Sequence, residues 1–131
     1  MISQALILQD NKVLMVKQYV QRGDIVWNYP GGGIEKKETP EEACIREVKE
    51  ETGYDVAIRK LLDKTSDKYT FVCEITGGEL WLDSNNEVNN DIIDIGWISL
   101  DDREKFDAYT MPLIERFFIR IDLRASEIVG K

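Results

Sequence analysis

One segment of the sequence is marked as a helix at both of its ends. Thr39 is a suitable N-cap, Pro40 follows at the first helical position, and Glu42 completes a T-x-x-E capping box. Gly53 is well placed to end the helix. These signals predict a helix over residues 39–52, around which the rest of the fold has to be arranged.

Strand-like segments flank this helix on both sides. Before it, the pattern predicts strands over residues 3–8, 13–17 and 25–29, then a break in regular structure at Pro30-Gly31-Gly32-Gly33. After it, the pattern predicts strands over residues 54–76, 79–82 and 92–98, with Gly77-Gly78 as a hairpin turn, and a second helix over residues 110–123. The predicted fold class is α+β, with a mixed and largely antiparallel sheet.

Charge and composition exclude several classes of function. The chain has 131 residues, about one domain, and its 17 basic and 25 acidic residues give a net charge of −8. Such a surface repels nucleic-acid backbones, so no nucleic-acid partner is expected. Histidine is absent, which excludes Ser-His-Asp catalysis and a histidine-ligated zinc site.

Cysteine usage and hydropathy indicate a compartment. Cys44 and Cys73 are too few for a zinc cluster, and we expect two reduced, buried thiols. No stretch approaches 18 apolar residues, and no basic segment precedes the first strand, so neither a membrane span nor a signal peptide is expected. The predicted location is cytoplasmic, without a membrane partner.

Three carboxylates share one face of the predicted helix. At about 100° per residue, Glu47, Glu50 and Glu51 fall within an arc of about 100°. Like charges at this spacing cost an isolated helix roughly 0.2–0.5 kcal/mol per pair, a cost that a divalent cation such as Mg²⁺ or Mn²⁺ would offset. The alternative is a solvated acidic face, because glutamate is a good helix former. Arg46 either orients a carboxylate through a bidentate contact or makes an ordinary surface pair.

The spacing of these residues resembles the Nudix box, G-x5-E-x7-R-E-U-x-E-E-x-G-U, where U is a bulky apolar residue. Here Gly32 is followed after five residues by Glu38, and after seven more by the run Arg46-Glu47-Val48-Lys49-Glu50-Glu51-Thr52-Gly53-Tyr54. The lead-in over residues 27–33 and the stretch over residues 96–100 are also similar to the family. A motif with this many fixed positions is far more specific than a lone glycine pattern.

The resemblance implies a single Nudix hydrolase domain over residues 1–131, folded as an α/β/α sandwich. It implies Mg²⁺ or Mn²⁺ held by Glu47, Glu50 and Glu51, with Glu38 and the Gly32 carbonyl as further ligand candidates. Arg46 would orient the glutamates, and Glu50, Glu51 and Arg46 are the catalytic candidates. The general base stays open between Glu50 or Glu51 in the box and Glu87 or Asp91 in a later loop.

Substrate contacts are expected outside the box. Lys17, and more weakly Arg22, are candidates for binding phosphate, or else are exposed surface cations. Glu87 and Asp91 are also candidates for substrate contact, or else belong to a solvated loop. Trp27 and Tyr29 either stack on a nucleobase or pack in the core.

The resemblance implies a metal-dependent pyrophosphohydrolase that cleaves the diphosphate bond of a nucleoside diphosphate linked to another group. A small nucleotide resembling a nucleoside triphosphate is favoured as substrate. In some Nudix subfamilies a proline downstream of the box hints at ADP-ribose, and here no proline lies between Pro40 and Pro112, which weakens that alternative. The alternative is a catalytically silent nucleotide-binding or regulatory domain. A homodimer is possible through an edge strand at residues 79–82.

Overall fold

The computed structural model describes residues 1–20 and 23–119. The strands are β1 (Ile2–Leu6), β2 (Leu8–Gln9), β3 (Lys12–Tyr19), β4 (Ile25–Asn28), β5 (Gly31–Gly33), β6 (Tyr54–Lys64), β7 (Lys68–Gly78) and β8 (Ile92–Ser99). The helix α1 spans Pro40–Thr52, and short 3-10 helices lie at η1 (Glu87–Asn89) and η2 (Arg103–Lys105). Residues 111–119 are also helical.

The strands form two sheets of four strands each. The first has the order β5-β1-β7-β6, in which β1 and β7 run parallel and the other pairs run antiparallel. The second has the order β2-β3-β4, with β8 paired antiparallel to β3. The predicted α+β class with mixed, largely antiparallel pairing is therefore confirmed.

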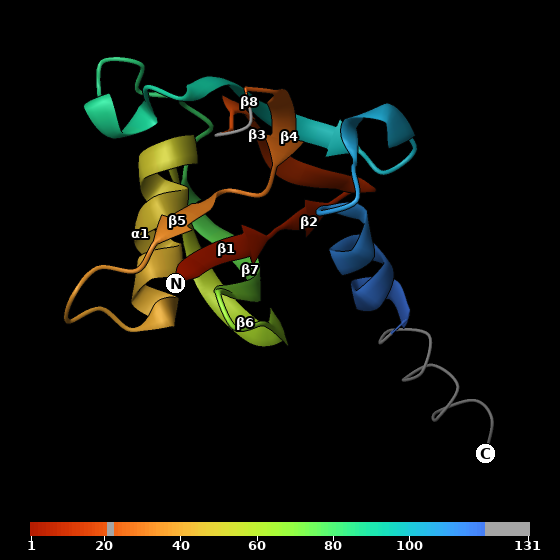
Figure 1. Cartoon of the computed structure of the whole chain (residues 1–131), viewed down its shortest axis with the longest axis horizontal. Coiled ribbons are helices and arrows are strands. Elements are labelled where there is room, and N and C mark those ends of the chain that lie inside the picture. Colours follow the sequence, from red (N-terminus) through yellow and green to blue (C-terminus); the bar gives the residue numbers. More distant parts are fainter. Residues whose placement is uncertain (21–22, 120–131) are drawn as a thin grey trace.

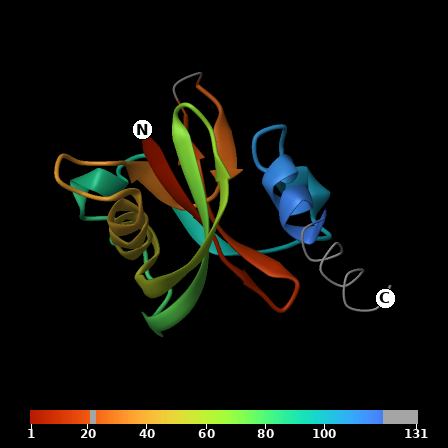
Figure 2. The ribbon, with the colours of Figure 1, turned by 90° about the horizontal axis from the view of Figure 1, so that it is seen from below.

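The sheets lie between the two helices (Figure 1, Figure 2). Ala5, Ile7 and Leu14 belong to a buried cluster that includes Cys44 and Val48 of α1. Their neighbours along the same strands belong to a second cluster, which includes the following residues of β1, β3 and the last helix: Leu6, Val13, Met15, Leu113 and Ile114. Because side chains alternate along a strand, each sheet face has its own core and its own helix.

Helix α1 begins and ends as its sequence predicts. The Thr39 hydroxyl accepts a hydrogen bond from the backbone N–H of Glu42 at 3.1 Å, and the Glu42 carboxylate accepts one from the N–H of Thr39 at 2.9 Å. Gly53 follows the helix with φ of 84° and donates its N–H to Lys49. This left-handed conformation is readily accessible to glycine.

Two local predictions about glycines are wrong. Gly31–Gly33 was expected to break regular structure but forms β5, which pairs with β1. Gly77 and Gly78 were expected to form a turn but lie in β7, opposite Asp55 and Tyr54. In both cases a neighbouring strand, β1 or β6, offers backbone groups for pairing, and hydrogen bonding to them outweighs the weak strand preference of glycine.

The segment at residues 79–82 is not a strand, so the edge proposed for a homodimer does not exist in this form. The second helix is described over residues 111–119, and the rest of its predicted range, to residue 123, lies outside the described residues. Cys44 and Cys73 are buried free thiols whose sulfurs lie 3.8 Å apart. In the part of the chain that the structure describes, no helix is long and apolar enough to cross a membrane.

Candidate functional site

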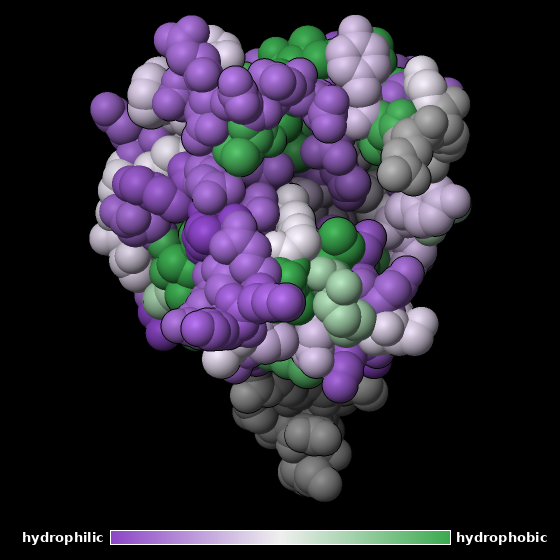
Figure 3. Space-filling view, turned by 60° about the vertical axis from the view of Figure 1, so that its left-hand side comes forward, coloured by the Kyte–Doolittle hydropathy of each residue, from purple (hydrophilic) through white to green (hydrophobic). Residues whose placement is uncertain are grey.

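A polar cleft of about 330 Å³ lies beside α1. Its walls come from β3, β5, the loop after β5, α1 and the connection into β8: Gln18, Gly31, Gly32, Glu35, Arg46, Glu47, Glu50, Glu51, Val88, Asp91 and Ile92. Seen from the side of α1, the molecular surface is largely hydrophilic, with apolar residues in separate small groups (Figure 3). Glu47, Glu50 and Glu51, the three helical carboxylates predicted to act together, all line this cleft.

Arg46 is the centre of the hydrogen-bond network in this cleft. Its Nε and Nη2 donate to the two oxygens of Glu38 at 2.7 and 2.8 Å. Its Nη1 donates to Glu47 at 2.9 Å and, over a longer 3.3 Å, to Glu50. Nη2 also donates to the Gly33 carbonyl at 3.0 Å. The predicted orienting role of Arg46 thus has a geometric basis: one guanidinium holds carboxylates of α1 and of the preceding loop.

Glu38, which belongs to the network, and Glu51, which lies outside it, have pKa values shifted in opposite directions. The hydrogen bonds from Arg46 hold the pKa of Glu38 at about 2. Burial raises the pKa of Glu51 to about 8, because its 8% exposed side chain is removed from water. The backbone N–H of Gly31 donates to Glu51 at 2.8 Å and partly opposes that rise. Burial also raises the pKa of Glu47.

Gly32 leaves room for a carboxylate. A Cβ atom at this residue would lie 2.6 Å from Oε1 of Glu47, inside van der Waals contact. The absence of a side chain therefore lets Glu47 lie directly over the β5 backbone. The sequence indicated Gly32 as a ligand candidate through its carbonyl, whereas the structure shows that it also makes room for Glu47.

The remaining predicted residues are divided between the two sides of the sheet. Asp91 lines the cleft, whereas Glu87 is exposed and does not line it. Gln18 lines the cleft too, and its neighbour Lys17 therefore points to the other face of β3. There the Lys17 ammonium lies 6.0 Å from the ring centre of Trp27, which packs against the core of the second helix.

Tyr29 is a core residue and does not line the cleft. It is 3% exposed, and its hydroxyl donates to the Thr110 carbonyl at 2.6 Å. The suggested phosphate contact of Lys17 and the suggested stacking by Trp27 and Tyr29 therefore have no support from their positions. Arg22 lies outside the described residues.

Sequence reasoning missed several residues of the site. Gln18, Val88 and Ile92 line the cleft but carry no chemical signature, and their place depends on strand pairing. Glu35 was also missed, although its position between the glycine run and the helix was a possible signal. Its carboxylate lies 3.9 Å from Arg46.

The donor set fits a hard divalent cation in its chemistry. Carboxylate oxygens from Glu47, Glu50 and Glu51 face one cleft, where Gly32 leaves space. In the described ranges 1–20 and 23–119, however, no three acidic side chains are already gathered as a metal site. Arg46 already pairs with Glu47 and Glu50, so a cation would have to draw those carboxylates from the guanidinium.

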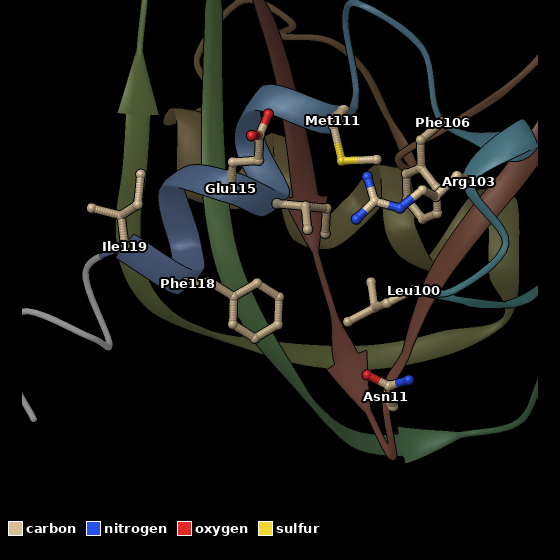
Figure 4. A pocket seen from close by; sticks show the side chains of 9 residues that line it. Asn11, Leu100, Arg103, Phe106, Met111, Glu115, Phe118 and Ile119 are labelled. Atoms are coloured by element: carbon tan, nitrogen blue, oxygen red, sulfur yellow. The ribbon is translucent and has the colours of Figure 1, made fainter.

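A larger cavity of about 440 Å³ lies on the opposite side, against residues 111–119. Most of its lining is apolar, including Leu100, Phe106 and Met111, with Arg103 and Glu115 as its charged residues (Figure 4). One carboxylate and one guanidinium do not make a hydrolytic or cation-binding set. The smaller acidic cleft is therefore the candidate active site.

Comparison with known proteins gives a consistent result. The model of the NUDIX domain family matches residues 2–117. A Caenorhabditis elegans protein carrying the nudix hydrolase name is 34% identical over 86% of this chain and 30% of its own length. An ADP-ribose pyrophosphatase of Methanocaldococcus jannaschii is 35% identical over 57% of this chain and 50% of its own length. Other relatives are named 8-oxo-dGTP diphosphatase and RNA pyrophosphohydrolase.

The chain thus spans half or less of the length of these first two curated relatives. Among solved structures, a NUDIX hydrolase from Nitrosomonas europaea superposes with a TM-score of 0.75 and 27% identity, covering 90% of this chain and 87% of that one. Fold, motif and family model agree, and the chain belongs to the Nudix domain family.

Proposed function

We propose that this protein is a divalent-metal-dependent pyrophosphohydrolase acting on a nucleotide-like substrate. One observation carries the proposal: Glu47, Glu50 and Glu51 line a single cleft with Gly31 and Gly32. A solvated acidic face would not require a buried glutamate, yet Glu51 is 8% exposed. The names of the relatives, which include pyrophosphatases and diphosphatases, support the same reaction class.

Mg²⁺ or Mn²⁺, when bound, would polarise the phosphate oxygens and lower the pKa of a coordinated water. Glu47, Glu50 and Glu51 are the residues that would hold it, with the Gly32 carbonyl as a further candidate. Glu38 is bound to Arg46 and serves to orient the arginine. Arg46 in turn holds Glu47 and Glu50 beside the cleft, and a metal ion would take these two carboxylates over from the guanidinium.

Glu51 is our preferred candidate for the general base. Its carboxylate lines the cleft, where a base has to reach the attacking water. Its hydrogen bond from Gly31 fixes the carboxylate relative to β5. Asp91 on the opposite wall remains the candidate from the later loop, whereas Glu87 does not line the cleft.

The choice of substrate is a finer proposal. We favour a nucleoside triphosphate or a close derivative, which agrees with the relatives named 8-oxo-dGTP diphosphatase. Other relatives are named for ADP-ribose or RNA. The net charge of −8, which disfavours a nucleic-acid partner, therefore does not by itself decide among these substrates. The cytoplasmic location and a homodimer stay predictions.

The test is a substrate panel with Mg²⁺ or Mn²⁺. It contains nucleoside triphosphates, 8-oxo-dGTP, ADP-ribose, dinucleoside polyphosphates, nucleotide sugars and 5′-triphosphorylated RNA, with products separated by chromatography. We expect metal-dependent release of a nucleoside monophosphate, or of 5′-monophosphorylated RNA, from at least one compound. Full turnover in EDTA would contradict the metal requirement. Nucleotide binding by calorimetry without hydrolysis would favour the alternative, a catalytically silent binding domain.

A further inference from the structure

Asn89 is the most deeply buried polar residue in the connection between β7 and β8. It ends η1 and is 3% exposed, although its neighbours Val88 and Asn90 are exposed. Its side-chain Nδ2 donates to the Glu50 carbonyl at 2.8 Å and to the Asp83 carbonyl at 3.2 Å. The side chain therefore joins this connection to the helix that carries the glutamates.

The contact lies at the C-terminal end of α1, where the last carbonyl groups have no partner within the helix. The connection provides partners for two of them: Asn89 donates to the Glu50 carbonyl, and the backbone N–H of Trp81 donates to that of Thr52 at 2.9 Å. In Figure 1 the connection lies next to this end of α1. The segment thus caps the helix from outside it.

The same connection supplies the second wall of the cleft. Val88 and Asp91, on either side of Asn89, line it opposite the carboxylates of α1. The two walls come from elements far apart in the sequence. The Asn89 amide joins them through a side-chain hydrogen bond to the backbone of α1.

The orientation of the amide is determined by its surroundings. Reversing it would bring Oδ1 against the carbonyl oxygens of Glu50 and Asp83, two acceptors, so the donors must face them. Oδ1 itself is buried without a hydrogen-bond partner among the described residues. An unpaired buried acceptor is unfavourable. Asparagine at this position is therefore explained by its two N–H donors.

We infer that Asn89 is a positioning residue, whose amide holds the Val88 and Asp91 wall at a defined distance from the glutamate face of α1. The inference rests on the proposed function for its catalytic consequence, but not for the contact itself. Loss of the anchor would leave the carboxylates in place, because core packing and Arg46 hold them. It would let the opposite wall move, so substrate binding would suffer more than metal binding.

The test compares Asn89→Ala and Asn89→Asp with Asn90→Ala, a matched control at the next residue, whose side chain is exposed. Asn89→Asp keeps the size of the side chain but removes the donors. We expect KM to rise about tenfold in both Asn89 variants, with kcat within about threefold of wild type. Mn²⁺ affinity measured by calorimetry is expected to stay unchanged, as are all values of the control.

Hydrogen–deuterium exchange separates this inference from the proposed function. The amides of η1 and residue 90 are expected to exchange faster in both Asn89 variants, with or without turnover. If the wild type hydrolyses nothing, the proposed function fails, and the Kd of α,β-methylene-ATP with Mn²⁺ replaces KM. The inference is overturned if Asn89→Asp has the KM and the amide exchange of wild type, or if either Asn89 variant matches Asn90→Ala in these values. It is also overturned if amide exchange increases over the whole chain, because that would indicate general destabilisation.

Discussion

Glu51 combines features that rarely occur together in one carboxylate. It is almost fully buried, it accepts a hydrogen bond from the Gly31 backbone, and it lies near two other glutamates. Burial and like charge both disfavour its ionised form, which explains the raised pKa. A carboxylate that lies in a cleft although its surroundings disfavour its ionised form is a candidate for function.

Substituting Glu51→Gln should affect stability and activity in opposite directions. The amide keeps the size and an acceptor oxygen for the Gly31 N–H, while one charge leaves a like-charged cluster. We expect the metal-free melting temperature at pH 8.5 to be equal or higher, and kcat to fall by about 10²-fold or more. Melting without metal and turnover with Mg²⁺, measured on one preparation, test both. A variant with wild-type kcat would remove Glu51 from the mechanism.

The same residue predicts how metal-free stability depends on pH. Between about pH 4.5 and 8, folded Glu51 keeps a proton that the unfolded chain has lost. The free energy of unfolding should therefore fall as pH rises through this window. For Glu38, whose folded pKa is about 2, the sign is opposite: its contribution is lost as pH falls below about 4.5.

Urea unfolding in EDTA across pH 3–9 checks this dependence. Wild type should be most stable near pH 4–5, and Glu51→Gln should lose most of the decline above pH 5. An equal decline in both proteins would show that Glu51 is not its source.

At the scale of the element, α1 is stabilised from both ends and from outside. Its own capping box satisfies the first N–H groups, and Gly53, Trp81 and Asn89 provide donors for the last carbonyls. Positioning of the glutamates therefore depends on local sequence at one end and on tertiary contacts at the other.

Thr39→Ala removes the hydroxyl that accepts from the Glu42 N–H. We expect the free energy of unfolding to fall by about 1 kcal/mol, within the usual range of about 0.5–2 kcal/mol for a lost N-cap. Because the glutamates lie two turns or more from this end, kcat should change less than twofold. Thr39→Ser, which keeps the hydroxyl, is the control in urea unfolding. A large loss of kcat at full occupancy would mean that the helix end is coupled to the site.

At the scale of the whole molecule, the sheets separate two faces with different chemistry. The acidic cleft lies with α1 on one side, and an apolar cavity lies with residues 111–119 on the other. Lys17 and Trp27 pair across β3 and β4 on the face that packs against the second core.

Lys17→Ala is therefore expected to leave KM and kcat within about twofold of wild type. Gln18→Ala, one residue further along the same strand, changes a side chain that lines the cleft. We expect it to raise KM by about threefold or more. Steady-state kinetics with the best substrate of the panel compares the pair. A tenfold effect at Lys17 with none at Gln18 would reverse the assignment of the two faces.

The sequence by itself determined the helix, its ends and its carboxylate face, because these depend on contacts within about four residues along the chain. Thr39, Glu42 and Gly53 act on their own neighbours, and the spacing of the glutamates on a helix follows from its period alone. The Nudix box combines such local features, which is why the amino-acid sequence alone is enough to indicate the family.

Only the tertiary structure decided what surrounds that helix. Gly31–Gly33 became a strand because β1 offered a partner, and Gly77 and Gly78 because β6 did. Tyr29 lies in the core through its packing in the second cluster and its hydrogen bond to Thr110, and Lys17 lies on the far face through the pairing of β3 with β4. No local pattern specifies either contact. Burial of Glu51 and the anchoring of Asn89 likewise depend on elements distant in sequence, because desolvation and non-local hydrogen bonds arise only when those elements meet.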